Sequence, residues 1–300
     1  MRTPIRSASS TKRARRRVAC CARWVWRTDV DVRLFEGSTR VDAIAASNRG
    51  LAYGDGLFET MRAHRGDVPW WDRHWMRLRR GGEALGIALP DEAQARAEAH
   101  ALLDGRDGVA KLVVTRGPGG RGYAPMAAPS FWMLSLHDAP PRQDRVTLRW
   151  CDTRLAIQPR LAGHKHCNRL EQVLARAEWR EGEAADDGLM RDVDGDVVSA
   201  IAGNVFVLNG DSWTTPAIDR CGVRGVCRAW AIDALDVRET RIAADAVESA
   251  DALFVCNAVR GILEVARLGD RVWSPHPQVA WLRERLATAH PAFALTSESP

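Results

Sequence analysis

The chain has 300 residues, which is long enough for two modest domains with real cores. Its hydrophobic content of 46% and charged content of 27% are ordinary for a globular protein, and no apolar run approaches the ~18 residues that a membrane span needs. The formal net charge of +5 comes from the first 31 residues, which hold nine Arg and Lys against two Asp, so the remainder carries −2. A basic body that would bind nucleic acid over its whole surface is therefore excluded.

Residues 1–31 are rich in Arg and Ser and show no apolar periodicity. This composition is typical of a disordered basic extension, which is the interpretation we prefer. Two alternatives remain: the cluster at residues 12–17 could contact nucleic acid or anionic lipid, and Arg16-Arg17 before a short apolar stretch faintly resembles an export signal. The seven cysteines are odd in number, scattered and without a C-x-x-C pair. They indicate neither a zinc site nor a disulfide framework, and we expect a reducing cytoplasm.

Residues 32–137 alternate strand and helix patterns, which predicts a small α/β domain. Turns at 36–38 and 65–67 each separate two strand-like runs and predict two hairpins. Asp72 is the expected N-cap of the first long helix. The predicted strands are 33–35, 39–41, 57–64, 68–71, 109–115 and 130–136, and the predicted helices are 72–85 and 91–103.

A stretch with two consecutive prolines, 138–145, predicts a linker, and 146–300 predicts a larger α/β domain. The whole chain is therefore expected to be α/β (α+β) with two domains. In the second domain the predicted strands are 146–150, 188–191, 197–199, 205–208, 213–215, 237–242, 253–256 and 262–268, and the predicted helices are 168–177, 223–235, 243–249 and 278–287.

One lysine, Lys165, lies between two histidines where a loop rich in Pro, Gly and Ala meets the predicted helix 168–177. Cationic neighbours and partial burial lower a lysine pKa and make the free amine available. The candidate neighbours in sequence are His164, His166 and Arg169. A positioned free amine is what Schiff-base chemistry needs. On its own, the pattern favours a solvated surface lysine, because lysines are rarely buried.

The segment 161–172 reads Leu-Ala-Gly-His-Lys-His-Cys-Asn-Arg-Leu-Glu-Gln and resembles the lysine motif of the fold-type IV pyridoxal-phosphate (PLP) enzymes, the group with the D-amino-acid aminotransferase-like fold. Within that family the aminodeoxychorismate lyases have the most similar flanks. The resemblance extends over nearly everything from about residue 33. It implies PLP as cofactor, Lys165 as the catalytic lysine that binds it, and a homodimer. It also implies elimination of pyruvate from the small-molecule substrate aminodeoxychorismate, giving 4-aminobenzoate for folate synthesis.

A phosphate-binding end is implied by three further matches. Residues 222–228 resemble the family's glycine-punctuated phosphate turn, with the amides of Val226 and Cys227 facing the anion at a helix start. Arg77 stands at the arginine of the family's H-x-x-R-L motif. Asn257 and Ala258 match a strand end that supplies a further contact, through the N–H of Ala258 and the side-chain amide of Asn257.

The pyridine end departs from the family. Most relatives place a glutamate five residues before the Asn of an E-x-x-x-x-N motif, where it keeps the ring nitrogen protonated, but here Ser199 precedes Asn204 at that spacing. A hydroxyl lacks the opposite charge that holds a pyridinium. Because a less protonated ring is a poorer electron sink, we expect Ser199 to favour elimination over transamination. An impaired or repurposed relative is the alternative.

A glycine-rich loop at 115–123 follows a predicted strand and resembles a loop of the lyases. Arg121 is the first candidate to bind a substrate carboxylate and Arg116 the second. The segment 48–60 resembles another family motif and places Tyr53 in the site wall, with Asp55 expected as a turn-former. The alternatives to a lyase are a branched-chain or D-amino-acid aminotransferase, and a non-catalytic protein whose basic arm binds nucleic acid. No metal site is expected.

Overall fold

The computed structural model describes residues 31–294. The predicted basic extension falls outside the described residues, except for Asp31, which begins the first strand. Between residues 31 and 294, no helix combines the length and apolar character that crossing a membrane requires.

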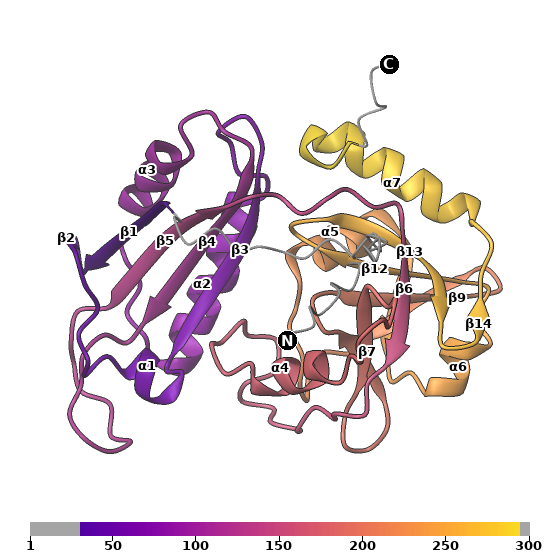
Figure 1. Ribbon diagram of the computed structural model, residues 1–300, viewed down its shortest axis with the longest axis horizontal. Helices are drawn as coiled ribbons and strands as arrows, with labels where there is room; N and C mark the ends of the chain where they lie inside the picture. Colours follow the sequence, from indigo (N-terminus) through magenta and orange to yellow (C-terminus); the bar gives the residue numbers. More distant parts are fainter. Residues whose placement is uncertain (1–30, 295–300) are drawn as a thin grey trace, which may run out of the picture. The chain divides into compact units, whose positions relative to one another are not determined.

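Residues 31–137 form an antiparallel five-stranded sheet in the order β2-β1-β5-β4-β3 (Figure 1). Helices α2 and α3 bury their apolar sides against this sheet, in a core that includes Trp75, Leu78 and Leu103. The short helix α1 precedes β3 and was not predicted. The elements are β1 (Asp31–Glu36), β2 (Thr39–Val41), α1 (Arg49–Tyr53), β3 (Gly56–Ala63), α2 (Trp71–Leu85), α3 (Glu92–Leu103), β4 (Gly108–Thr115) and β5 (Phe131–His137).

Two local predictions in this half are wrong. The segment 68–71 forms no strand; the second hairpin is reduced to a single bridge between His64 and Asp67. The N-cap of helix α2 is Trp70, two residues before the predicted cap Asp72, and its φ of 62° is left-handed, while Asp72 lies in the first turn. The ring of Trp70 stacks on Phe293 at 4.9 Å, so tertiary packing stabilises this start where a side-chain cap is missing.

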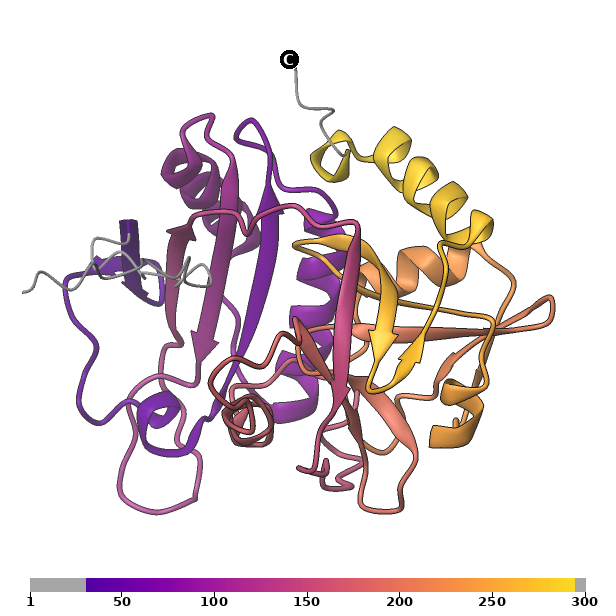
Figure 2. The ribbon, with the colours of Figure 1, turned by 45° about the vertical axis from the view of Figure 1, so that its right-hand side comes forward.

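Residues 145–272 form a second, mixed sheet in the order β11-β10-β9-β12-β13-β6-β7-β8, with β14 paired to β13. Helix α5 packs on β12 in a core with Phe206 and Phe254. Figure 2 shows that the two sheets are separate and that the chain passes from the first to the second through the segment before β6. The elements are β6 (Arg145–Trp150), α4 (Leu170–Ala177), β7 (Asp187–Arg191), β8 (Val197–Ala200), β9 (Asn204–Asn209), β10 (Ser212–Pro216), α5 (Val226–Ala234), β11 (Val237–Thr240), α6 (Ala244–Glu248), β12 (Ala252–Asn257), β13 (Gly261–Leu268), β14 (Arg271–Val272), α7 (Pro277–Ala289) and the 3-10 turn η1 (Pro291–Phe293).

Strand β3 carries two different faces, because successive side chains of a strand point to opposite sides. Leu57, Met61 and Ala63 are buried in the core under α2 and α3. The alternate residues, beginning with Phe58, point to the other side of the sheet. This division decides which side chains can meet the segment that carries Lys165.

Candidate active site

The Lys165 segment is fixed by backbone hydrogen bonds on two sides. The N–H of Phe58 donates to the carbonyl of Lys165 at 2.9 Å, and the N–H of Cys167 donates to the carbonyl of Gly56 at 2.8 Å. On the other side, Gly163 exchanges hydrogen bonds with the turn before α5, donating to Gly222 at 3.0 Å. The lysine therefore stands between the start of β3 and the turn that the sequence assigns to a phosphate.

Lys165 is held as a reactive amine. Its Nζ lies 4.2 Å from the centroid of the Phe58 ring. Burial, followed by repulsion from Arg77, lowers the pKa of Lys165 to about 7; Glu59 opposes this shift, and Arg169 and Lys111 add smaller repulsions. The sequence predicted a lowered pKa but named only Arg169 among these cations.

The two flanking histidines do not act on Lys165 as expected. Burial lowers the pKa of His166 to about 4 and also lowers the pKa of His164, so both rings are neutral near pH 7 and add no positive charge. Arg169 instead donates to the carbonyls of both histidines, at 3.2 and 2.9 Å. Asn168 donates to the carbonyl of Gly54 at 3.3 Å. These bonds brace the loop, as the sequence indicated for Asn168 and Arg169.

A buried carboxylate orients Arg77, and sequence reasoning missed it. Glu59 accepts hydrogen bonds from Nε and a terminal nitrogen of Arg77 and from Nδ1 of His74, the last at 2.6 Å. Burial alone raises the pKa of Glu59, but the charges and hydrogen bonds of Arg77 and His74 bring it down to about 2. Glu59 therefore stays ionised. The signal in the sequence was a glutamate at a core-facing position of β3, because such a charge requires a buried partner.

The start of α5 fits an anion. Arg77 donates to the carbonyl of Arg224 at 3.2 Å and so lies beside this helix start. Between residues 31 and 294, the backbone N–H groups of Val226 and Cys227 donate to no other group, and the N-cap Gly225 offers no side chain. A Cβ at Gly225 would come within 2.1 Å of Asn204 Oδ1, so the turn passes close to that side chain. Free N–H groups at a helix N-terminus with an adjacent guanidinium are suited to phosphate.

The three other predicted cofactor contacts, Asn257, Ala258 and Ser199, differ in how far their polar groups are already occupied. The side-chain amide of Asn257 donates to the carbonyl of Ala202 at 3.2 Å, and its Oδ1 accepts from two N–H groups of its own turn, so only the second amide hydrogen is left for the expected contact with a phosphate. The carbonyl of Ala258 accepts from the N–H of Arg62 at 3.2 Å, leaving its own N–H for a ligand. Ser199 is partly buried in the middle of β8, opposite Met190.

Arg62 is a second residue that sequence reasoning missed. It shares the face of β3 that carries Phe58, it is 6% exposed, and its Nε has no hydrogen-bond partner within the described chain. Burial and repulsion from Arg142 lower the pKa of Arg62. A small pocket is lined by Arg62, Pro140, Pro141, Arg142, Gln143, Val259, Arg260, Ala292 and Phe293. A buried guanidinium without a partner is a candidate for an anionic ligand.

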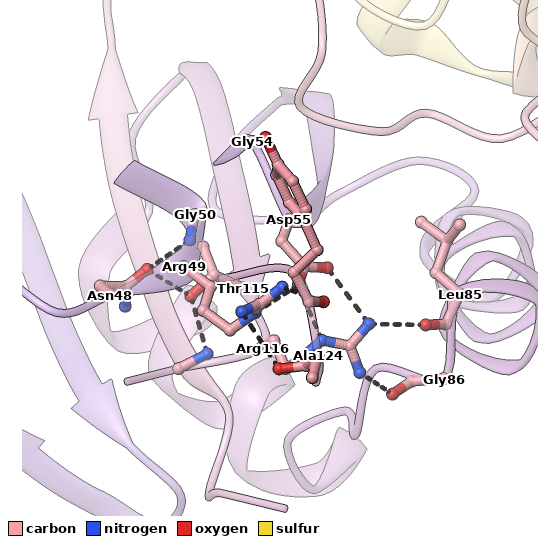
Figure 3. Close-up of polar contacts among 12 residues, drawn as sticks. Asn48, Arg49, Gly50, Gly54, Asp55, Leu85, Gly86, Thr115, Arg116 and Ala124 are labelled. Carbon is pink, nitrogen blue, oxygen red and sulfur yellow. Dashed lines mark hydrogen bonds and ion pairs between the residues drawn. The ribbon is translucent and has the colours of Figure 1, made fainter. Parts of the chain in front are cut away.

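The structure separates the two candidate substrate arginines. Arg121 is exposed on the glycine-rich loop. Arg116 is engaged: it forms a two-pronged ion pair with Asp55, at 2.8 and 3.2 Å, and donates to the carbonyls of Leu85 and Gly86 (Figure 3). These contacts do not support Arg116 as a substrate ligand, and they show Asp55 as an ion-pair acceptor as well as a turn residue. Tyr53 is 37% exposed beside Tyr123, with ring centroids 5.5 Å apart.

The geometry defines a lysine-centred site of the class IV aminotransferase type. The family model of amino-transferase class IV matches residues 56–268, and the chain belongs to this family. The predicted fold class, α/β (α+β) of fold-type IV, is thereby confirmed.

Two similar proteins are both aminodeoxychorismate lyases. An aminodeoxychorismate lyase of Vibrio harveyi is 32% identical over 236 residues, covering 74% of this chain and 86% of that protein. The crystal structure of 4-amino-4-deoxychorismate lyase from Pseudomonas aeruginosa is 38% identical with a TM-score of 0.80, covering 86% of this chain and 99% of that one. A putative branched-chain-amino-acid aminotransferase of Methanocaldococcus jannaschii is 27% identical over 247 residues, covering 76% of this chain and 84% of that protein.

Proposed function

We propose that this chain is a PLP-dependent lyase that converts 4-amino-4-deoxychorismate into 4-aminobenzoate and pyruvate, a step that supplies folate synthesis. The observation that carries the proposal is Lys165, whose Nζ lies 4.2 Å from the centroid of the Phe58 ring and whose pKa is lowered to about 7 by burial and by the charge of Arg77. The similarity to two lyases, at 32% and 38% identity over most of the chain, supports the choice of reaction.

The described residues fit the cofactor. Arg77 and the free N–H groups of Val226 and Cys227 would hold its phosphate, and the N–H of Ala258 would add a contact. Glu59 keeps Arg77 oriented, because two of its guanidinium nitrogens already donate to that carboxylate. Lys165 would bind the cofactor's aldehyde, which requires the neutral amine that its lowered pKa supplies.

When bound, PLP withdraws electrons from the carbon attached to the substrate nitrogen and makes its proton acidic. Lys165 is placed to remove that proton, since a base with a pKa near the working pH is effective. The bond from the ring to the enolpyruvyl oxygen then breaks, the ring becomes aromatic, and the enol takes a proton to become pyruvate. The substrate divides into the two products without an oxidant or net consumption of water, so no further co-reactant is needed.

Two arginines are candidates for the two substrate carboxylates. Arg62 follows Phe58 by four residues, which places their Cα atoms about 13 Å apart on one face of the strand, and its Nε lacks a partner in the described structure. Arg121 is exposed and could bind a carboxylate in the same chain or in a second copy. Arg116, which ion-pairs with Asp55, is better explained as a structural residue.

Ser199 favours the lyase over an aminotransferase. Its hydroxyl carries no charge to hold the ring nitrogen protonated, and a weaker electron sink hinders transamination more than an elimination that ends in an aromatic product. This argument separates the proposal from the amino-transfer suggested by the Methanocaldococcus jannaschii relative.

Ser199→Glu tests this argument. We expect the variant to gain measurable amino transfer to pyruvate, with ping-pong kinetics, while pyruvate release from aminodeoxychorismate persists. Ser199→Ala is the control and should gain no transfer. A glutamate variant that transfers no more amino groups than the control would contradict the role given to Ser199.

We also propose that the two sheets mark two domains, residues 32–137 and 146–300, joined by a linker at 138–145, and that the protein is a homodimer. Large apolar side chains are exposed on α1, on the glycine-rich loop and on α4, which suits a second copy of the chain. They are Leu51, Tyr53, Tyr123, Met126, Leu170, Val173 and Leu174. Leu174→Glu should shift the mass in analytical ultracentrifugation from dimer to monomer, whereas Val272→Glu, at an equally exposed site on β14, should leave a dimer. A dimer in both variants would contradict this surface.

Five cysteines between residues 31 and 294 are free, and four of them are buried. Free thiols persist in a reducing compartment, and we propose a cytoplasmic location on this ground.

The direct test of the cofactor is spectroscopic. Purified protein mixed with PLP should develop a visible absorbance band, and borohydride reduction should leave the cofactor's mass on the peptide with Lys165. Lys165→Ala should lose both signals, whereas Lys111→Ala, the neighbouring lysine, should keep them. A colourless wild-type protein would end the proposal.

A further inference from the structure

Asp55 joins two arginines that come from different parts of the chain. Its Oδ2 accepts from Nε of Arg49 at 2.8 Å and from Nε of Arg116 at 2.8 Å, and its Oδ1 accepts from Arg116 at 3.2 Å (Figure 3). The Arg49 side chain is 6% exposed, the Arg116 side chain 14% and the Asp55 side chain 16%. Partly buried ion pairs with this geometry hold their partners more firmly than surface pairs.

Arg49 extends this contact into the glycine-rich loop. Its two terminal nitrogens donate to the carbonyls of Gly122 at 3.0 Å, Tyr123 at 3.1 Å and Ala124 at 3.5 Å. Its guanidinium also lies 4.9 Å from the centroid of the Tyr53 ring. While its Nε is held by Asp55, the two terminal nitrogens of Arg49 thus hold three consecutive loop carbonyls, directly after Arg121.

The base of the loop is tied to the same helix start. The N–H of Arg49 donates to the carbonyl of Gly117 at 2.9 Å, and the N–H of Gly119 donates to the carbonyl of Ser47 at 3.0 Å. A Cβ at Gly119 would come within 2.7 Å of Arg49 Cδ. The glycine is therefore required for the close approach of the loop to the arginine stem.

The two residues that flank Asp55 contact the segment that follows Lys165. The next residue, Gly56, accepts from the N–H of Cys167 at 2.8 Å, and Gly54 abuts Asn168, whose Oδ1 a Cβ there would meet at 2.6 Å. One carboxylate thus links the loop of residues 117–124 to the start of β3, which is hydrogen-bonded to the Lys165 segment.

We propose that Asp55 and Arg49 are positioning residues that hold the loop of residues 117–124 in the conformation that presents Arg121 to a substrate carboxylate. This inference rests on the proposed function. The ion pair touches neither the lysine nor the phosphate turn, so it acts on substrate binding and leaves cofactor attachment intact. Arg116 anchors the same carboxylate to the end of α2 through Leu85 and Gly86.

The test uses Asp55→Asn and the milder Arg49→Lys, which keeps the charge but loses the planar fork. For both, KM for aminodeoxychorismate should rise about tenfold or more while kcat changes less than about threefold, the pattern of lost uniform binding. The absorbance band of the bound cofactor should be unchanged. Arg33→Lys is the matched control, because Arg33 also pairs with a carboxylate, Glu98, and donates to a backbone carbonyl of α3; its KM should not change.

A second readout does not depend on the reaction. The rate of trypsin cleavage after Arg121, followed by mass spectrometry on the PLP-bound protein, should increase in Asp55→Asn and Arg49→Lys and stay unchanged in Arg33→Lys. Unchanged cleavage would overturn the positioning role even if the proposed reaction is correct.

A double-mutant cycle then connects the ion pair with Arg121. If Asp55 acts through Arg121, the KM of Asp55→Asn/Arg121→Ala should equal that of Arg121→Ala alone. Additive increases would overturn the inference. Trypsin cleavage could be faster in Asp55→Asn and Arg49→Lys while Arg121→Ala leaves KM unchanged. That result would show that the ion pair holds the loop but that Arg121 does not bind substrate, and it would overturn the inference. Loss of the cofactor band in both single variants would also overturn it.

Discussion

Two carboxylates four residues apart, Glu59 and Asp55, each gather two cationic partners, but they do so for different purposes. Glu59 lies on the core-facing side of β3 and pairs with His74 and Arg77 of α2. Asp55 lies just before β3 and pairs with Arg49 and Arg116. The Glu59 side chain is 2% exposed and the Asp55 side chain 16%.

The difference lies in where the remaining arginine donors point. Arg77 keeps one terminal nitrogen on the carbonyl of Arg224, at the helix start proposed to bind phosphate. Arg49 and Arg116 also donate to backbone carbonyls, but these belong to the loop before β5 and to the end of α2, not to the start of α5. The same ion-pair chemistry therefore prepares a ligand site in one place and stiffens the protein around it in the other.

Glu59→Gln should have the largest effect. It removes the buried charge that compensates the half-buried Arg77, so we expect the free energy of unfolding to fall by about 3–5 kcal/mol and the affinity for PLP to fall with it. Urea unfolding of the PLP-free protein measures the first, and titration with PLP the second. Glu98→Gln, in the more exposed pair with Arg33, should cost less than about 1 kcal/mol. If the free energy of unfolding fell equally in Glu59→Gln and Glu98→Gln, Glu59 would be no more important to stability than an exposed ion pair.

Replacing one arginine at each carboxylate compares the two centres directly. Arg77→Lys should raise the Kd for PLP about tenfold, roughly 1.4 kcal/mol, because an ammonium cannot hold Glu59 and a phosphate with one planar group. Arg116→Lys should leave that Kd unchanged. Fluorescence titration with PLP measures both Kd values. If Arg116→Lys raised the Kd as much as Arg77→Lys does, the ion pairs of Glu59 and Asp55 would both belong to the cofactor site, and the comparison would be wrong.

The pH dependence of PLP attachment sharpens the comparison further. The amine of Lys165 is neutral above its pKa, so the rate of PLP attachment should rise with pH and reach half its maximum near pH 7 instead of near 10.5. Glu59 raises this pKa, so Glu59→Gln should move the midpoint to lower pH, whereas Asp55→Asn should leave it in place. Stopped-flow absorbance gives these midpoints, and a wild-type midpoint above pH 9 would contradict the lowered pKa.

The same shift affects the stability of the PLP-free protein. Because the pKa of Lys165 is lowered on folding, the unfolded chain binds more protons between pH 7 and about 10.5, and the free energy of unfolding gains from rising pH in that window. Lys165→Met should remove this contribution. Identical pH slopes in the variant and the wild type, measured by urea unfolding, would show that Lys165 is not desolvated.

Much of the fold and part of the site could be predicted from the sequence. Turn residues and alternating patterns predicted the ends of most strands to within one or two residues. The lysine motif indicated the family that the family model confirms. Helix α2 was misplaced at its start because Trp70 is held left-handed by ring packing, which no local pattern records.

The missed site residues share one cause. Glu59 and Arg62 are charged residues inside a strand whose neighbours Leu57 and Met61 are core, and their partners or lack of partners depend on packing between distant segments. Only the parity of β3 could have indicated that Glu59 faces α2 and Arg62 faces the other side. The occupation of Arg116 by Asp55, 61 residues away in sequence, could not be read from the glycine-rich loop itself.

The most direct measurement is the release of pyruvate and 4-aminobenzoate from aminodeoxychorismate by the PLP-loaded protein, with Lys165→Ala beside it. The account predicts equal amounts of the two products from the wild type and a rate at least about 10⁴-fold lower in the variant, the upper range of what one acid–base group contributes. A wild-type protein that binds PLP at Lys165 but releases neither product, or a variant that retains the wild-type rate, would contradict it.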